Sequence, residues 1–162
     1  MGIPPINIIS NGRANPEGIN YLYASDQLAT VLSEVRAWKG AIVSVAHILI
    51  TKNLRIVDFT YINDSISPFE AKLNKKIEIN KILKAFANDL SKPINPNKSK
   101  LDYLPTQYIC ELIKNYGYEG IKFKSSLGDG NNIVLFNSKG IKIDKVDLVR
   151  VKNISYEYED FS

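Results

Sequence analysis

Hydrophobic and polar positions near the start of the chain predict a short strand followed by a helix. Residues 21–23 form an apolar run that is typical of a strand, and Ser25 follows as a residue that can cap a helix. Four apolar residues then recur at the i, i+3, i+4 and i+7 spacing of one buried helical stripe: Leu28, Val31, Leu32 and Val35. Glu34 lies beside this stripe, so we expect its carboxylate to be partly buried.

A β-hairpin is predicted in the next stretch. Residues 41–50 are rich in β-branched side chains, and residues 54–59 alternate between apolar and polar positions. A tight turn near residues 51–53 would join the two strands. The uncharged segment from Gly40 to Thr51 has 12 residues, too few for the roughly 20 that span a bilayer. We therefore interpret it as a core strand, with His47 as a buried imidazole.

Two helices are predicted in the middle of the chain. Pro68 opens the first helix, which presents its lysines to water and ends at the proline-containing stretch 93–100. Its apolar face comprises Phe69, Leu73, Ile82, Leu83, Phe86 and Leu90. The second helix begins at Pro105 or Thr106 and ends before Gly117. Its inner stripe comprises Tyr108, Ile109, Leu112, Ile113 and Tyr116.

Strands dominate the remainder of the chain. Ile121 and Phe123 alternate with lysines, residues 133–136 form an apolar run, and residues 141–151 alternate for most of their length. Strands and helices do not follow the regular alternation of a doubly wound fold. We therefore predict an α+β fold with a mixed, mostly antiparallel sheet and flanking helices. The length of 162 residues predicts a single domain over residues 1–162.

Composition narrows the classes of function. With one cysteine, Cys110, and one histidine, the chain can form no internal disulfide and offers no Cys-based or His-rich metal site, so we expect no metal. The N-terminal sequence does not have the basic and apolar regions of a signal peptide, which favours a cytoplasmic location and no membrane partner. The sequence contains neither a dinucleotide-binding GxGxxG after a strand nor a P-loop.

The net charge of +4 is concentrated in one region. Between Lys72 and Lys100 there are eight lysines against Glu78 and Asp89. Lysines on one amphipathic segment are typical of a solvated helix face, and no nucleic-acid-binding motif accompanies them. A direct nucleic-acid partner is therefore not favoured.

Three segments in the first 34 residues carry side chains that suit a nucleotide. Arg13, in the turn-rich segment 12–18, can hold two oxygens of a diphosphate, or it is a surface arginine at a turn. Tyr23 or Tyr21 can stack on a pyridinium ring, or either can be a core residue. Glu34 can accept hydrogen bonds from ribose hydroxyls and stabilise positive charge at the anomeric carbon, or it pairs with neighbours on the helix surface.

A fourth segment joins two of the predicted strands. Ser125 and Ser126 can offer hydroxyls to a ligand, and Gly128 and Gly130 allow backbone amides to approach it closely. A plain hairpin loop explains the glycines equally well. No histidine lies near in sequence to activate a serine, so a serine hydrolase is not favoured.

Taken together, these segments resemble the RES domain family, the toxin half of bacterial toxin-antitoxin pairs, named for an Arg, a Glu and a Ser. The matching stretches follow the family's order across nearly the whole chain: GRANP (12–16), YLYA (21–24), EVR (34–36), YLPTQ (103–107), GIKFKSS (120–126) and NIVLF (132–136).

The resemblance implies an ADP-ribosyltransferase-like fold and an enzyme that cleaves the nicotinamide-ribose bond of NAD⁺ by hydrolysis or by phosphorolysis with inorganic phosphate. NAD⁺ is then the substrate, and no other cofactor is implied. By position, the implied catalytic residues are Arg13, Tyr23, Glu34 and Ser125. Further implied substrate-binding residues are Asn15, Tyr21, Ser126 and Asn132. Lys124 stands where the family usually has a proline, which leaves Ser126 as an alternative to Ser125, and Tyr21 likewise remains an alternative to Tyr23.

The resemblance also implies a proteinaceous antitoxin that blocks the active site, and it leaves a homo-oligomer open. Two other functions compete with NAD⁺ degradation. The first is transfer of ADP-ribose to a protein or nucleic acid, which shares the cleavage step and changes the acceptor. The second is non-enzymatic binding of nucleic acid by the lysine-rich face, which would show a steep dependence on salt.

Overall fold

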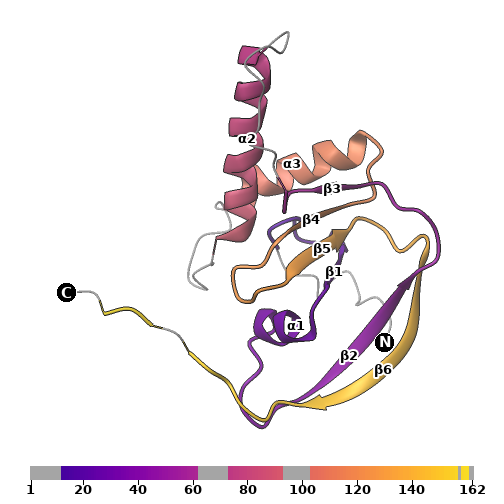
Figure 1. The fold of residues 1–162 in the computed structure, drawn as a ribbon. Coiled ribbons are helices and arrows are strands. Elements are labelled where there is room, and N and C mark those ends of the chain that lie inside the picture. The colour runs from indigo at the N-terminus through magenta and orange to yellow at the C-terminus, as the bar shows by residue number, and fades with distance from the viewer. Residues whose placement is uncertain (1–11, 62–72, 93–102, 157, 161–162) are drawn as a thin grey trace.

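The computed structural model describes residues 12–61, 73–92, 103–156 and 158–160. These residues form six strands and three helices, which Figure 1 colours in chain order. The elements are β1 (Leu22–Ser25), α1 (Leu28–Glu34), β2 (Ile42–Ile50), β3 (Ile56–Asp58), α2 (Leu73–Ser91), α3 (Leu104–Asn115), β4 (Gly120–Lys124), β5 (Asn131–Leu135) and β6 (Ile141–Arg150).

The strands form two separate sheets. One has four strands in the order β1-β5-β4-β3, and the other is a ribbon of β2 and β6. All pairings are antiparallel except that of β3 with β4. Figure 1 shows α2 and α3 at the β3 end of the larger sheet, and α1 with the β2–β6 ribbon at the β1 end. The predicted α+β class with a mostly antiparallel sheet is confirmed.

The predicted hairpin of residues 41–50 with residues 54–59 is wrong. β2 pairs with β6, and β3 pairs in parallel with β4. A parallel pair needs a long crossover, which α2 and α3 supply between β3 and β4. The Glu119 carboxylate accepts hydrogen bonds from Lys52 Nζ at 2.6 Å and from Arg55 N at 3.1 Å. These bonds join the segment after β2 to the residue before β4, next to the parallel pairing of β3 with β4.

The β2 strand is also not the core strand that its apolar sequence predicts. Of its nine residues only Val45 is buried, because the ribbon exposes both of its edges and much of one face. His47 is exposed, and its Nε2 lies 2.9 Å from Asp147 Oδ2 on β6. The expectation of a buried imidazole is therefore wrong.

The core lies between the four-stranded sheet and the helices α2 and α3. Apolar side chains of β4 and β5 pack against Phe86 and Leu90 of α2 and against Cys110 of α3. Phe59 meets Phe86 edge to face, with 4.9 Å between the ring centroids. The remaining buried members of this cluster are Ala14, Tyr21, Ile121, Phe123, Val134 and Phe136. The N-terminal segment that carries Arg13 is thus anchored in the same core.

The predicted helical stripes are only partly right. On α2, Phe86 and Leu90 are buried and Leu83 is partly buried, but Ile82 is exposed. The other predicted positions, Pro68, Phe69 and the side chain of Leu73, lie outside the described residues. On α3 the buried residues are Thr106, Gln107 and Cys110, whereas Tyr108 and Tyr116 are exposed. The α3 helix turns its polar first turn inward because that turn binds a loop, as described below. Gly117, at φ +80°, follows α3 as predicted.

The short helix α1 differs from its prediction in the same way. Leu28 and Val35 are exposed, and the one buried side chain is Thr30. The predicted cap is also wrong, because α1 is preceded by Gln27 and has no side-chain cap. The Ser25 hydroxyl instead donates to the carbonyl of Asn131 on β5 at 2.8 Å. The hydroxyl therefore bonds a carbonyl of the neighbouring strand and does not cap the helix.

Candidate active site

The loop that carries Arg13 is held by the first turn of α3. The Thr106 hydroxyl donates to the carbonyl of Arg13 at 2.6 Å. The Gln107 side-chain amide donates to the carbonyls of Gly12 and Asn15 at 2.8 and 3.0 Å. Thr106 and Gln107 are almost fully buried, so an acceptor left without its donor here would cost about 1–3 kcal/mol. The backbone of Arg13 is therefore fixed from the helix side.

The guanidinium of Arg13 joins two segments that are distant in sequence. Nη1 donates to the carbonyl of Leu90 near the end of α2, and Nη2 donates to Ser126 Oγ at 3.3 Å. Burial lowers the pKa of Arg13 from its ordinary value, while the carboxylate of Glu34 acts in the opposite direction. A guanidinium stays protonated in proteins. It is thus a permanent positive charge within the electrostatic reach of Glu34.

Tyr23 on β1 is fixed by its hydroxyl and leaves much of its ring open. The hydroxyl donates to Asn15 Oδ1 at 2.6 Å and accepts from Ala14 N at 3.2 Å. A Cβ on Gly12 would lie 2.7 Å from the same hydroxyl, so a glycine is needed where the loop passes over it. Burial of this end raises the pKa of Tyr23 to about 12, although 47% of the residue is exposed. The exposed part is available to a planar ligand.

Glu34 is the last residue of α1, and two neutral donors hold its carboxylate. Ser125 Oγ donates to Glu34 Oε1 at 2.7 Å, and Asn132 Nδ2 donates to the same oxygen at 2.6 Å. Among the described residues, no hydrogen bond is made to Oε2. The chain turns away just after the helix, where Arg36 adopts a left-handed φ of 50°. Glu34 therefore presents one fixed and one open oxygen at the end of its helix.

The loop that carries both serines is docked on the helix that carries Glu34. Gly130 N donates to the Thr30 hydroxyl at 3.0 Å, and the Gly130 carbonyl accepts from Ser125 N at 3.0 Å. A Cβ on Gly128 or Gly130 would lie 2.8 or 2.5 Å from Thr30 Oγ1. These glycines permit close approach to a buried side chain. The alternative of a plain hairpin loop does not explain this contact with α1.

The comparison with protein families decides the identity of the chain. The model of the RES domain matches residues 4–158. The chain belongs to the RES domain family. RES domains are generally associated with toxins that act on NAD. Neither the search of curated proteins nor that of solved structures finds a match.

The RES domain brings the four predicted catalytic residues into one connected cluster. Arg13 bonds Ser126, whose neighbour Ser125 bonds Glu34. Tyr23 belongs to the same cluster because its hydroxyl bonds Ala14 and Asn15, which follow Arg13 in the loop. Each serine contacts a different candidate catalytic residue, Ser125 the carboxylate of Glu34 and Ser126 the guanidinium of Arg13.

The predicted substrate-binding residues have mainly internal partners. Asn15 is 3% exposed, and its side chain bonds Tyr23 and the carbonyls of Pro16 and Ile19. Asn132 is 9% exposed and bonds Glu34. Both asparagines position a neighbouring side chain.

Tyr21 lies away from this cluster and in the core. It is 6% exposed, its ring lies 4.9 Å from that of Phe136, and its hydroxyl donates to Glu111 and accepts from Lys114 at 3.1 Å. Burial and the Glu111 carboxylate raise the pKa of Tyr21. Of the two tyrosines, only Tyr23 is exposed at the surface of the molecule.

Three positioning residues were missed as site residues. Thr30, Thr106 and Gln107 are buried and polar, and each binds a loop that carries a candidate catalytic side chain. Thr106 and Gln107 do fall in the YLPTQ stretch of the family resemblance, whereas nothing in the local sequence distinguishes Thr30. Among the described residues no cluster of side chains could hold a metal ion, and no helix is long and apolar enough to cross a membrane.

Proposed function

We propose that this RES domain degrades NAD⁺ by cleaving the bond between nicotinamide and ribose. The observation that carries the proposal is the Glu34 carboxylate, which is held at Oε1 by Ser125 and Asn132 and whose Oε2 has no hydrogen bond within the described part of the chain. An aromatic ring and a guanidinium belong to the same cluster. This set of groups suits a sugar, a pyridinium ring and a diphosphate, which are the three parts of the nicotinamide half of NAD⁺.

The chemistry of the leaving group explains why one carboxylate suffices. When the bond between C1 of the ribose and the pyridinium nitrogen breaks, the electron pair leaves with nicotinamide, which departs neutral. Little general acid is needed, and positive charge develops on the ribose. A preorganised carboxylate stabilises that charge more in the transition state than in the ground state. We assign this role to Glu34, with its Oε2 facing the ribose.

The other side chains hold the substrate in place. The exposed part of the Tyr23 ring would stack on nicotinamide, and Arg13 would bind a phosphate oxygen. Arg13 already donates to Leu90 and Ser126, so it is held in place before a ligand arrives. Its remaining N–H groups are the ones we assign to the ligand.

The acceptor completes the reaction. An oxygen of water or of inorganic phosphate forms the new bond to the ribose carbon, giving ADP-ribose or its phosphorylated form, and the proton passes to solvent. An enzyme that degrades NAD⁺ must be inhibited, so we expect a proteinaceous antitoxin that blocks the active site as its partner.

The test is product analysis with purified protein and NAD⁺ labelled in the adenosine half, with and without inorganic phosphate. Nicotinamide together with free ADP-ribose would indicate hydrolysis, and a phosphate-dependent phosphorylated product would indicate phosphorolysis. Label on an added protein or nucleic acid would instead support ADP-ribosyl transfer. NAD⁺ that stays intact under all these conditions would refute the proposal.

A further inference from the structure

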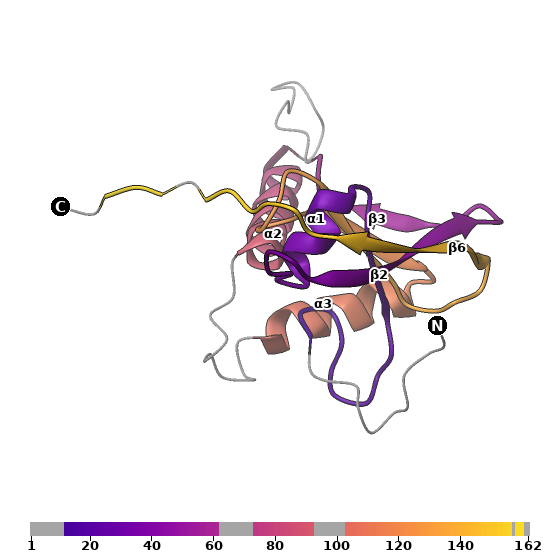
Figure 2. The same ribbon diagram turned by 90° about the horizontal axis from the view of Figure 1, so that it is seen from below.

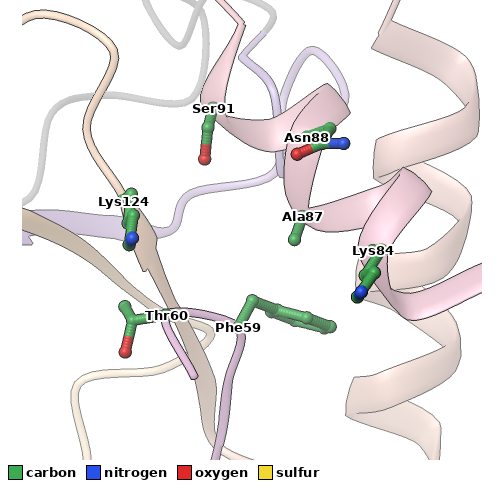
Figure 3. Close-up of a pocket in the computed structure, with 7 residues that line it drawn as sticks. All are labelled: Phe59, Thr60, Lys84, Ala87, Asn88, Ser91 and Lys124. Carbon is green, nitrogen blue, oxygen red and sulfur yellow. The ribbon is translucent and has the colours of Figure 1, made fainter. Parts of the chain in front are cut away.

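A cavity of about 210 Å³ lies between α2 and the ends of β3 and β4. One stripe of α2 forms one wall, with Lys84, Ala87, Asn88 and Ser91 at i, i+3, i+4 and i+7. Figure 3 shows these residues along the helix, with Lys124 at the end of β4 and Phe59 and Thr60 just after β3 facing them. None of the residues so far assigned to the reaction lines this cavity.

The cavity is next to the candidate active site. Arg13 donates to Leu90, the residue before Ser91, and to Ser126, two residues after Lys124. The guanidinium thus bridges the two chain segments that form opposite walls of the cavity. A ligand that binds Arg13 in the proposed way would lie beside the two segments that line this cavity.

The residues that line the cavity combine apolar surface with groups that can bind an anion. Phe59 and Ala87 supply apolar surface, while two lysine ammonium groups, an amide and a hydroxyl are donors, and none of the described lining residues carries a carboxylate. Among the described residues, the exposed Lys124 has no carboxylate partner. The nearby Asp58 carboxylate accepts from Thr60 N and Oγ1 at 2.8 and 2.6 Å, so Thr60 is not counted as a donor to a ligand.

One effect opposes an anion at this place. The C-terminal end of a helix carries a partial negative charge that repels anions, and Ser91 ends α2. Arg13 offsets this charge by donating to the Leu90 carbonyl in the last turn. Three cations oppose this partial charge: Arg13 at the Leu90 carbonyl, and Lys84 and Lys124 in the lining of the cavity.

We propose that this cavity binds a phosphate group, with Lys124 and Lys84 as the charged contacts and Asn88 and Ser91 as neutral donors. The inference deepens the proposed function and rests on it for the identity of the ligand. The phosphate can come from the adenosine side of the dinucleotide or from the free inorganic phosphate of phosphorolysis. The chemistry recognised is the same in both cases.

The test is binding, measured by calorimetry at constant ionic strength with ADP, inorganic phosphate and adenosine as separate probes. The variants are Lys124→Gln and Lys84→Gln, and the matched control is Lys142→Gln, an exposed lysine on β6. We expect each cavity variant to weaken ADP binding about fivefold or more, the effect of about 1 kcal/mol for one partly exposed ion pair. Adenosine binding and the Lys142 variant should match wild type.

The pattern of losses identifies the source of the phosphate. Weaker binding of ADP alone assigns the cavity to the dinucleotide, and weaker binding of inorganic phosphate as well assigns it to the free anion. Both patterns support the site. Unchanged ADP and phosphate affinities in the cavity variants, or an equal loss in Lys142→Gln, would overturn it.

These measurements do not depend on turnover, which separates the two proposals. A protein that binds ADP through Lys124 but leaves NAD⁺ intact would refute the proposed function and keep the phosphate site. If the wild-type protein cleaves NAD⁺ but Lys124→Gln and Lys84→Gln bind both phosphate probes normally, the proposed function would stand and the phosphate site would be refuted.

Discussion

The Ser125 hydroxyl donates to Glu34 Oε1 at 2.7 Å across 91 residues of sequence. Thr30 connects the same two segments a second time. It lies one helical turn before Glu34, and its hydroxyl accepts from the amide of Gly130 in the loop of Ser125. The loop and the helix are therefore locked together before any ligand binds. A carboxylate fixed in advance avoids the reorganisation that would otherwise oppose catalysis.

Replacing Glu34 tests whether the carboxylate stabilises the ribose cation. Glu34→Gln keeps the size of the side chain and an oxygen that can accept from Ser125, but it removes the negative charge. We expect kcat for NAD⁺ cleavage to fall about 100-fold or more, the scale of losing one such stabilising group. Nicotinamide release measures turnover, and circular dichroism checks the fold. The control is Asp129→Asn, an exposed carboxylate in the serine loop, which should keep wild-type kcat. Full activity in Glu34→Gln would remove the assigned role.

The two serines should have different kinetic effects because they contact different residues. Ser125→Ala removes one of the two donors to Glu34, so we expect kcat to fall about tenfold with KM little changed. Ser126→Ala removes a 3.3 Å contact to Arg13, so we expect a raised KM for NAD⁺ and a kcat near wild type. Steady-state kinetics of the two variants gives both parameters. Equal effects of the two substitutions on kcat would contradict this division of roles.

The sequence predicts which candidate residues lie together better than it predicts the packing of the fold, and the roles of those residues stay predictions. Arg13, Tyr23, Glu34 and Ser125 belong to segments that carry the family resemblance, and the structure connects them. Glu34 is partly buried as expected, but it lies against Ser125 and Asn132, because Leu28 and Val35 of the predicted stripe are exposed. The choice of these residues rests on the order of several short stretches along the chain, and it needs no knowledge of how the strands pair.

The errors concern pairings between distant segments. The apolar run of β2 favours a core strand, but its partner β6 comes about ninety residues later and forms an exposed ribbon. Strand alternation places Tyr21 and Tyr23 on the same side, yet only Tyr21 lies against Glu111 of α3. The inward face of α3 is set by Gln107, a polar residue that periodicity alone assigns to the surface. No local pattern carries this information.

Hydrogen bonds from Gln107 on α3 clamp the loop that carries Arg13, and a stability measurement tests this clamp. Gln107→Leu removes the amide that donates to the carbonyls of Gly12 and Asn15. We expect the free energy of unfolding to fall by about 1–3 kcal/mol, the cost of buried acceptors without donors. Urea denaturation measures this change. Tyr108→Ala is the control, because Tyr108 is 71% exposed and surface substitutions usually stay within about 0.5 kcal/mol. A Gln107 variant as stable as this control would show that the clamp contributes nothing.

Alkaline pH should destabilise the fold through three buried acids. Burial raises the pKa of Tyr23 from its ordinary value of 10 to about 12 and that of the Cys110 thiol from 9 to about 12, and it also raises the pKa of Tyr21. The folded protein therefore holds these protons more tightly than the unfolded chain does. The free energy of unfolding should be unaffected by these groups below about pH 9 and should fall as the pH rises from there toward about 12.

Urea denaturation at about pH 8 and about pH 11 measures the decline. In Cys110→Ala, which removes the group with the lowest ordinary pKa of the three, the decline should begin nearer to about pH 10. A free energy of unfolding that stays constant up to about pH 11 would mean that these groups are not buried as neutral acids.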